Sequence, residues 1–186
     1  MLILASQSPR RAELLRQIGV AFRCLPADID ETPLRNEIAK DYVRRMAVDK
    51  ARAVHASHPE DAVLGSDTTV VLDDRILGKP VDRELGIALL QQLSGKTHRV
   101  LTGVALVHHR VDYAVSESEV RFRTIDCSEA ARYWDSGEPR DKAGGYAIQG
   151  LGAVFVERIS GSYSGIMGLP IFETAQLLRG VGLNRP

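Results

Sequence analysis

Two hydroxyl side chains and two cations follow one another near the start of the chain. The segment Ser6–Arg11 reads SQSPRR, and Ser8 before Pro9 is typical of a helix N-terminus. The helix dipole opposes cations in a first turn, so Arg10 and Arg11 fit best if a phosphate lies beside them and the exposed N–H groups. Phosphate binding is therefore favoured, although both arginines could instead point into solvent or pair with acids.

Lys50 lies within the apolar stripe of a long predicted helix. Val43, Met46 and Val54 recur at helical spacing, and position 50 falls on the same face. Lys50 could lay its stem on apolar surface and extend its ammonium group to water. It could equally aim the ammonium group at a bound anion, and this helix alone does not decide between the two.

Asp67 lies inside a predicted buried strand. The segment Gly65–Thr69, which reads GSDTT, separates the apolar runs Ala62–Leu64 and Val70–Leu72. Strand interiors disfavour Gly and Asp, and a buried carboxylate is costly unless it is paired, metal-bound or protonated. A strand end or bulge would also account for the pattern. We favour a functional Asp67, because local propensity often fails at functional sites.

A polar segment that contains glycines lies in the last third of the chain. Asp141–Gly150 reads DKAGGYAIQG, and its adjacent glycines allow close approach of the backbone to a ligand. The amide of Gln149 can both donate and accept, which suits the edge of a nucleotide base. On this segment alone, an ordinary glycine turn is the better explanation.

The elements that must position these residues alternate between helix and strand, which favours an α/β fold. Strands are predicted at residues 2–5, 20–25, 62–72, 75–77, 97–107, 113–124 and 153–159. Helices are predicted from Pro9 to a stop at Gly19, at 36–57, at 83–93, from a cap at Ser128 to Gly137, and at 170–180. Residues 27–33 are expected to form an acidic loop, and 160–168 a loop or a short turn of helix.

Size and charge restrict the class of protein. The chain has 186 residues, and its 24 Lys and Arg balance its 24 Asp and Glu, which argues against general nucleic-acid or membrane-surface binding. No apolar stretch approaches the ~20 residues needed to span a bilayer, and the apolar start is too short for a signal peptide, so we expect a cytoplasmic protein. Cys24 and Cys127 are expected to be buried, reduced thiols rather than a disulfide or a zinc site.

Taken together, these segments resemble the Maf family of nucleotide pyrophosphatases over nearly the whole chain. The matching pieces, in order, are Ala5–Arg11, Asp30–Glu31, Lys50–Ala51, Gly65–Thr68, Gly78–Pro80 and Asp141–Gly144. Their order and approximate spacing make the resemblance specific, although any one piece alone would be weak.

A finer resemblance concerns the substrate. Residues 145–150, followed by 161–164 and 168–170, are similar to the YhdE-type members of the family, which are associated with dTTP and UTP. Another subgroup, associated with 7-methyl-GTP, carries different residues where Ile148 and Gln149 stand here. The resemblance therefore implies cleavage of dTTP and UTP to the monophosphate and pyrophosphate, a reaction that would serve to sanitise the nucleotide pool.

The resemblance also implies a fold. It predicts an elongated mixed and bent sheet with flanking helices, in which two lobes enclose a central cleft, as in inosine triphosphate pyrophosphatases. Residues 1–186 would form one such domain. A homodimer is compatible with the resemblance, and the expected partner is a small nucleoside triphosphate rather than nucleic acid or a membrane.

Cleavage between the α and β phosphates needs water to attack the α phosphorus while pyrophosphate leaves, and preorganised cations stabilise the developing charge. The expected catalytic residues are Arg11, Lys50, Lys79 and Asp67. Asp67 is the proposed general base of the family, and it would act on water that a metal has acidified or that Asp67 itself orients. Ser6 and Ser8 would hold phosphate oxygens.

Glu31 is expected to join Asp67 in holding the metal. Hard oxygen ligands, without a cluster of His and Cys, point to Mg²⁺, with Mn²⁺ as a substitute. Base choice would fall to Arg10, Thr68 and Gln149, which match specificity positions of the family. Two alternatives stay open at this stage: a 7-methyl-GTP pyrophosphatase on the same scaffold, and a nucleotide-binding regulator of septum formation.

Overall fold

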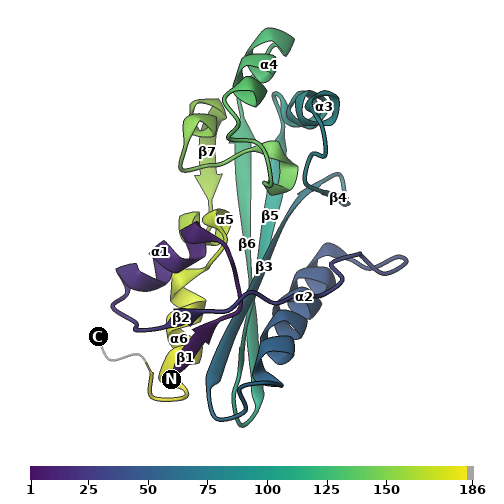
Figure 1. The fold of residues 1–186 in the computed structure, drawn as a ribbon. Coiled ribbons are helices and arrows are strands. Elements are labelled where there is room, and N and C mark those ends of the chain that lie inside the picture. The colour runs from purple at the N-terminus through teal and green to yellow at the C-terminus, as the bar shows by residue number, and fades with distance from the viewer. Residues whose placement is uncertain (184–186) are drawn as a thin grey trace.

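A computed structural model describes residues 1–183, which form a seven-stranded mixed sheet flanked by helices (Figure 1). Its strands are β1 (Leu2–Leu4), β2 (Arg23–Cys24), β3 (Ala62–Leu72), β4 (Arg75–Leu77), β5 (Thr97–Val107), β6 (Val111–Phe122) and β7 (Val156–Ser160). Its α-helices are α1 (Pro9–Gln17), α2 (Ala39–His55), α3 (Arg83–Leu93), α4 (Cys127–Asp135), α5 (Tyr163–Met167) and α6 (Ile171–Arg179). Short 3₁₀ helices are η1 (Ala143–Gly145) and η2 (Leu151–Phe155).

Three long strands connect two lobes. The sheet order is β2-β1-β3-β5-β6-β7, with β4 also pairing with β3, and β3, β5 and β6 run the length of the molecule (Figure 1). We call the part around β1, β2, α1, α2 and α6 the lower lobe, and the part around α3, α4, β4 and β7 the upper lobe. The expected elongated α/β fold with two lobes is confirmed.

Helices cover both faces of the sheet in the lower lobe. Helices α1 and α6 lie on one face, where Leu14 and Leu15 pack with strand residues such as Leu4 and Leu64. Helix α2 lies on the other face (Figure 1). Strand side chains alternate between the faces, so neighbouring residues of β3 contact different helices. The two faces therefore have separate apolar cores.

Close packing places α2 directly on the central strands. A Cβ atom at Gly65 would lie 2.1 Å from the carbonyl oxygen of Ala47, and one at Gly103 would lie 2.2 Å from that of Val43. Gly103 is the partner of Asp67 in the β3–β5 register. Only glycine permits this approach, which brings the buried face of α2 against the segment of β3 that carries Asp67.

The upper lobe has its own core around Phe122 of β6, which packs with residues of α3, α4, η2 and the loop at 146–148. Helix α4 begins with a capping box: the carboxylate of Asp126 accepts from the N–H of Glu129, and the Glu129 side chain accepts from the N–H of Asp126. The predicted cap at Ser128 is therefore wrong. An Asp three residues before a Glu satisfies both N–H groups reciprocally, which Ser128 could not do.

Several predicted boundaries differ from the structure. Residues 153–159 were expected to be one strand, but η2 occupies 151–155 and the strand covers 156–160. In the predicted strand 20–25, only Arg23 and Cys24 pair with β1. The predicted helix 36–57 is shorter at both ends, and the predicted strand 113–124 begins and ends two residues earlier. The short turn of helix expected within 160–168 is present as α5. The strands 62–72 and 97–107 and the helix 83–93 are confirmed as predicted.

The prediction for the cysteines is also wrong in one respect. Cys24 and Cys127 are free thiols, as expected, but both are exposed. Cys24 lies on the short edge strand β2, and Cys127 is the first residue of α4. Apolar neighbours in the sequence do not bury a side chain at a sheet edge or a helix start. No helix within residues 1–183 is long and apolar enough to cross a membrane.

Candidate active site

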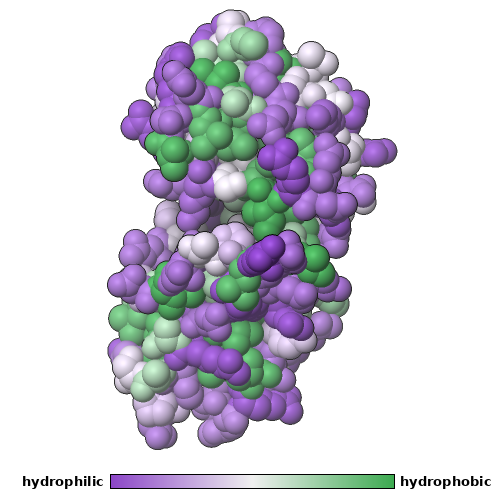
Figure 2. Space-filling model, turned by 90° about the vertical axis from the view of Figure 1, so that its right-hand side faces the viewer, coloured by the Kyte–Doolittle hydropathy of each residue, from purple (hydrophilic) through white to green (hydrophobic). Residues whose placement is uncertain are grey.

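A cleft of about 600 Å³ opens where the lobes meet, and Figure 2 shows the narrowing and the hollow between them. It lies at the carboxyl end of β1, which is where open α/β sheets place their ligands. β1 pairs with β3 only up to Leu64, and β4 pairs with it from Val70, so the intervening segment has an open edge on this side. Every residue predicted for the site lines this cleft: Ser6, Ser8, Arg10, Arg11, Glu31, Lys50, Asp67, Thr68, Lys79 and Gln149.

The turn from β1 into α1 has the predicted geometry. Ser8 caps the helix by accepting from the N–H of Arg11 at 3.4 Å, and Pro9 is the first helical residue. Ser6 Oγ accepts from the N–H of Ser8 at 3.1 Å. A hydroxyl that accepts from the protein still has its own hydrogen to donate. Both serines can therefore donate to an anion at this helix N-terminus.

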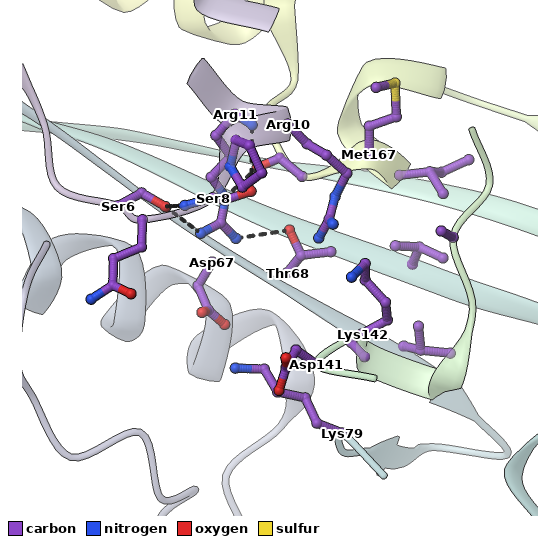
Figure 3. A pocket seen from close by; sticks show the side chains of 18 of the residues that line it. Ser6, Ser8, Arg10, Arg11, Asp67, Thr68, Lys79, Asp141, Lys142 and Met167 are labelled. Carbon is purple, nitrogen blue, oxygen red and sulfur yellow. Dashed lines mark hydrogen bonds between the residues drawn. The ribbon is translucent and has the colours of Figure 1, made fainter. Parts of the chain in front are cut away.

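Arg11 is held firmly by the protein. Its Nε donates to the carbonyl oxygen of Gly168 at 2.8 Å, Nη1 to Ser6 Oγ at 3.2 Å and Nη2 to Thr68 Oγ1 at 3.4 Å (Figure 3). Burial lowers the pKa of this guanidinium, while the charge of Asp67 opposes that shift. Arg11 thus supplies a fixed positive charge, and it neither points freely into solvent nor forms an ion pair within 1–183.

Lys50 joins two carboxylates. Its Nζ lies 2.7 Å from Asp67 Oδ1 and 2.6 Å from Glu31 Oε1, and its side chain is only 8% exposed. Lys79, which is mostly exposed, approaches Glu31 Oε2 at 3.5 Å. Burial raises the pKa of Glu31, but the hydrogen bonds and charges of both lysines outweigh burial and leave it below its usual value. The buried ammonium group therefore pairs with two carboxylates in the cleft lining rather than extending to water.

Asp67 has one oxygen available for chemistry. Its residue is 6% exposed, and Oδ2 is buried with no hydrogen-bond partner among the described residues. A buried carboxylate oxygen without a partner is costly. Water, a metal ion or a substrate hydrogen would satisfy it, and Asp67 lines the cleft that would hold them (Figure 3).

The carboxylates fit a hard cation that the substrate helps to bind. Mg²⁺ is usually held by one or two carboxylates together with substrate phosphates and water. Glu31 and Asp67 provide such a pair, and Asp67 Oδ2 is unpartnered. No group of three or more His, Cys, Asp or Glu side chains that could hold a metal occurs in residues 1–183. An ion here would therefore complete its coordination with other oxygen donors, such as substrate phosphates and water.

The other end of the cleft is apolar. Its lining there includes Val70, Val100, Tyr146, Ala147, Ile148, Ile166 and Met167. Thr68 Oγ1 lies on the floor, 2.9 Å from Thr102 Oγ1 and within reach of Arg11. Gln149 is exposed at the rim. An apolar slot with few polar groups is typical of a site for a flat organic ring.

The loop that carries Gln149 is fixed by a network of hydrogen bonds around Glu138 and Tyr133. Glu138 accepts from the N–H groups of Leu151 and Gly152, both at 2.9 Å, and from the hydroxyl of Tyr133 at 2.7 Å. That hydroxyl in turn accepts from the N–H of Ala147 at 3.0 Å. The adjacent glycines, Gly144 and Gly145, do form a turn, with positive φ angles of 66° and 70°, and the segment around them also lines the cleft.

The sequence reasoning missed Lys142. It is half-buried in the cleft lining and points toward Arg10 (Figure 3). The signal for Lys142 is its position inside the segment Asp141–Gly144, where the adjacent glycines are the more conspicuous feature. A cation within a segment that matches the family was itself a candidate for binding phosphate.

This chain is similar to known proteins over nearly its whole length. A family model described as Maf-like protein matches residues 1–181. A protein of Alkalilimnicola ehrlichii, named dTTP/UTP pyrophosphatase, is 55% identical over 181 residues, which cover 94% of this chain and 90% of that protein. A protein of Aromatoleum aromaticum with the same name is 54% identical over 194 residues, covering 96% of this chain and 94% of that protein.

A solved structure supports the fold alone. The Staphylococcus aureus Ham1 protein matches with a TM-score of 0.51 at 13% identity, over 83% of this chain and 79% of that one. The family match, by contrast, spans both lobes and every residue of the cleft. The chain is therefore a member of the Maf family.

Proposed function

We propose that this protein hydrolyses dTTP and UTP to the monophosphate and pyrophosphate, in the cytoplasm, as a means of sanitising the nucleotide pool. The observation that carries the proposal is the cleft itself. It combines cations, a buried carboxylate with an unpartnered oxygen, and an apolar slot with an amide at its rim. The relatives named dTTP/UTP pyrophosphatase support pyrimidine substrates over 7-methyl-GTP.

The triphosphate would lie among the cations. Arg11, Lys50 and Lys79 can neutralise phosphate oxygens, and the hydroxyl groups of Ser6 and Ser8 can donate to them. Because Arg11 is already held by three acceptors, it would need little reorganisation as charge develops on the leaving pyrophosphate. Electrostatic preorganisation is the main contribution that a protein makes to phosphoryl transfer.

Asp67 is suited to activate the attacking water. Its Oδ2 can accept a hydrogen from that water, while Lys50 holds Oδ1 in place. Orientation of the attacking water by Asp67 matters as much as proton transfer to it. A Mg²⁺ ion, held by Glu31 and Asp67, would neutralise phosphate charge and acidify bound water.

The base would occupy the apolar slot. A pyrimidine ring could pack between side chains such as Ile148 and Met167, with Thr68, Arg10 and Gln149 available for its polar edge. A site that offers fixed hydrogen-bond partners rejects a base that leaves them unpaired. These three residues are therefore proposed to select the base.

The test uses the purified protein with Mg²⁺ and each of dTTP, UTP, CTP, GTP and 7-methyl-GTP. Pyrophosphate and orthophosphate are measured separately, because only pyrophosphate release identifies cleavage after the α phosphate. The expected result is pyrophosphate from dTTP and UTP. Pyrophosphate from 7-methyl-GTP alone would overturn the specificity. Binding without any product would favour a nucleotide-binding regulator.

A further inference from the structure

Two cations face each other in the cleft without an acidic partner. The Arg10 side chain makes no hydrogen bond or ion pair within residues 1–183, and the Lys142 ammonium donates only to the carbonyl oxygen of Arg140, at 3.1 Å. Both side chains line the cleft, and both point into it from opposite lobes (Figure 3). Lys50 and Lys79, by contrast, each form an ion pair with a carboxylate of the site.

This arrangement is unfavourable as it stands. Burial lowers the pKa of Lys142, and the charge of Arg10 lowers it further, while Asp141 and Glu138 offset only part of this. Neither acid lies within ion-pair distance of the ammonium. Like charges that are held together in a partly buried site are relieved by an anion between them.

The position of the pair along the cleft suggests which anion that is. Figure 3 shows Arg10 and Lys142 between Asp67 on one side and Met167 on the other. Asp67 belongs to the end with carboxylates and lysines, and Met167 to the apolar slot. In a nucleoside triphosphate, the α-phosphoryl group is the phosphate that connects the nucleoside to the pyrophosphate.

We propose that Lys142 binds the non-bridging oxygens of the α-phosphoryl group of the substrate, beside Arg10, which keeps the role in base selection proposed above. The proposal rests on the function proposed above and adds a substrate-binding residue to it. The α-phosphoryl group is attacked by water and stays with the nucleoside monophosphate after cleavage. Lys142 therefore contacts both the substrate and this product, whereas pyrophosphate leaves without it.

The test separates binding of the two products. Lys142→Met removes the charge and keeps the length of the side chain, and Lys142→Arg restores the charge. Lys96→Met is a matched control, because Lys96 is exposed in the same lobe and does not line the cleft. Calorimetry, with Mg²⁺ present, measures binding of dTMP and of pyrophosphate to each variant, and thermal unfolding checks the fold.

We expect Lys142→Met to weaken dTMP binding about tenfold or more, as for the loss of one charge-assisted hydrogen bond. Pyrophosphate binding and the unfolding temperature should match those of the control, kcat on dTTP should fall, and Lys142→Arg should recover most of the affinity. Weaker pyrophosphate binding with unchanged dTMP binding would overturn the proposal, as would unchanged binding of both. An equal loss of affinity for dTMP and pyrophosphate, together with a lower unfolding temperature, would also overturn it.

Failure of the wider proposal would look different. If the wild-type protein bound dTMP through Lys142 but released no pyrophosphate from dTTP or UTP, the proposed activity would be wrong. The assignment of Lys142 would still stand as a phosphate-binding role.

Discussion

At the scale of single residues, the site depends on a few side chains whose surroundings conflict with their ordinary preferences. Asp67 is buried in a strand, and Lys50 is buried in the apolar face of a helix, yet each satisfies the other at 2.7 Å. An ion pair in a buried position seldom adds stability compared with apolar side chains. The pair is therefore better explained by function, and its available oxygen, Asp67 Oδ2, marks where the chemistry would occur.

Asp67→Asn tests the base directly. The amide keeps the size of the side chain but cannot accept a proton from water, so kcat on dTTP should fall by about 10²–10⁴-fold, with a small change in nucleotide affinity. Steady-state kinetics and nucleotide binding measure the two quantities. Asp49→Asn, which changes a carboxylate of the same lobe outside the cleft lining, is the control. Near wild-type turnover with saturating Mg²⁺ would remove Asp67 as the base.

Gln149→Ala tests base recognition at the rim of the cleft. Loss of the amide should reduce the preference for dTTP over GTP in kcat/KM by about tenfold, because discrimination of this kind comes from hydrogen bonds left unpaired with the wrong base. Turnover on dTTP should fall less than the preference does. Equal losses of kcat/KM on both nucleotides would exclude a role in specificity.

At the scale of elements, the contact between α2 and the strands below it decides the geometry of the site. Gly65 of β3 and Gly103 of β5 let the backbone of α2 approach so closely that no side chain fits between. This approach brings Lys50 to Asp67 across the interface. In the upper lobe, hydrogen bonds rather than close packing fix the geometry: Glu138 holds the loop of Gln149 by accepting from the backbone N–H groups of Leu151 and Gly152.

Gly103→Ala tests this contact. The new Cβ would lie 2.2 Å from the carbonyl oxygen of Val43, so α2 must move away. We expect a loss of about 1–3 kcal/mol in the free energy of unfolding, as for overpacked cores. We also expect a lower kcat, because Lys50 and Asp67 separate.

The matched control is Gly78→Ala, because a Cβ there meets no atom within 4 Å. Its free energy of unfolding should stay within about 0.5 kcal/mol of wild type. Chemical denaturation measures both variants. If Gly103→Ala matched Gly78→Ala in stability, the close packing of α2 would not be essential.

At the scale of the whole molecule, each lobe carries a core of its own and the cleft lies between them (Figure 2). His98 contributes to the upper core. It is 2% exposed, its Nε2 lies 2.8 Å from the hydroxyl of Tyr146, and its ring packs edge-on against Phe122. Tyr146 also lines the cleft, so the core and the substrate slot share a wall.

His98 predicts a loss of stability in acid. Burial lowers its pKa from 6.5 to about 4, so between these values the unfolded chain binds a proton that the folded chain does not. The free energy of unfolding should therefore fall as the pH drops from 6.5 toward 4, and His98 should account for up to about 3 kcal/mol of this loss. Above pH 7, protonation of His98 should not affect stability.

Thermal unfolding between pH 4.5 and 7.5 measures this effect. His98→Gln keeps a hydrogen-bonding group but cannot gain a proton, so its stability should vary less with pH than that of the wild type. Parallel curves for the two proteins would show that His98 does not cause the acid sensitivity.

The sequence alone determined much of the secondary structure and most of the candidate site residues. The cap at Ser8 and Pro9, the strand 62–72 and the helix 83–93 were predicted, because caps, alternation and helical spacing are local signals. The candidate residues Arg11, Glu31 and Lys79 were also named in advance, and all of them line one cleft. Their chemistry is a property of residue type, which the sequence states directly, and their grouping came from the resemblance to a family.

Only the tertiary structure decided which groups meet. The register that pairs Asp67 with Gly103 and the approach of α2 bring Lys50 between two carboxylates, and no local pattern encodes such contacts. The same holds for Lys142, which faces Arg10 only because the long strands place the lobes on either side of the cleft. Exposure of Cys24 also depended on its place at the sheet edge. Contacts between residues that are distant in sequence arise from packing of whole elements, which short-range propensities do not specify.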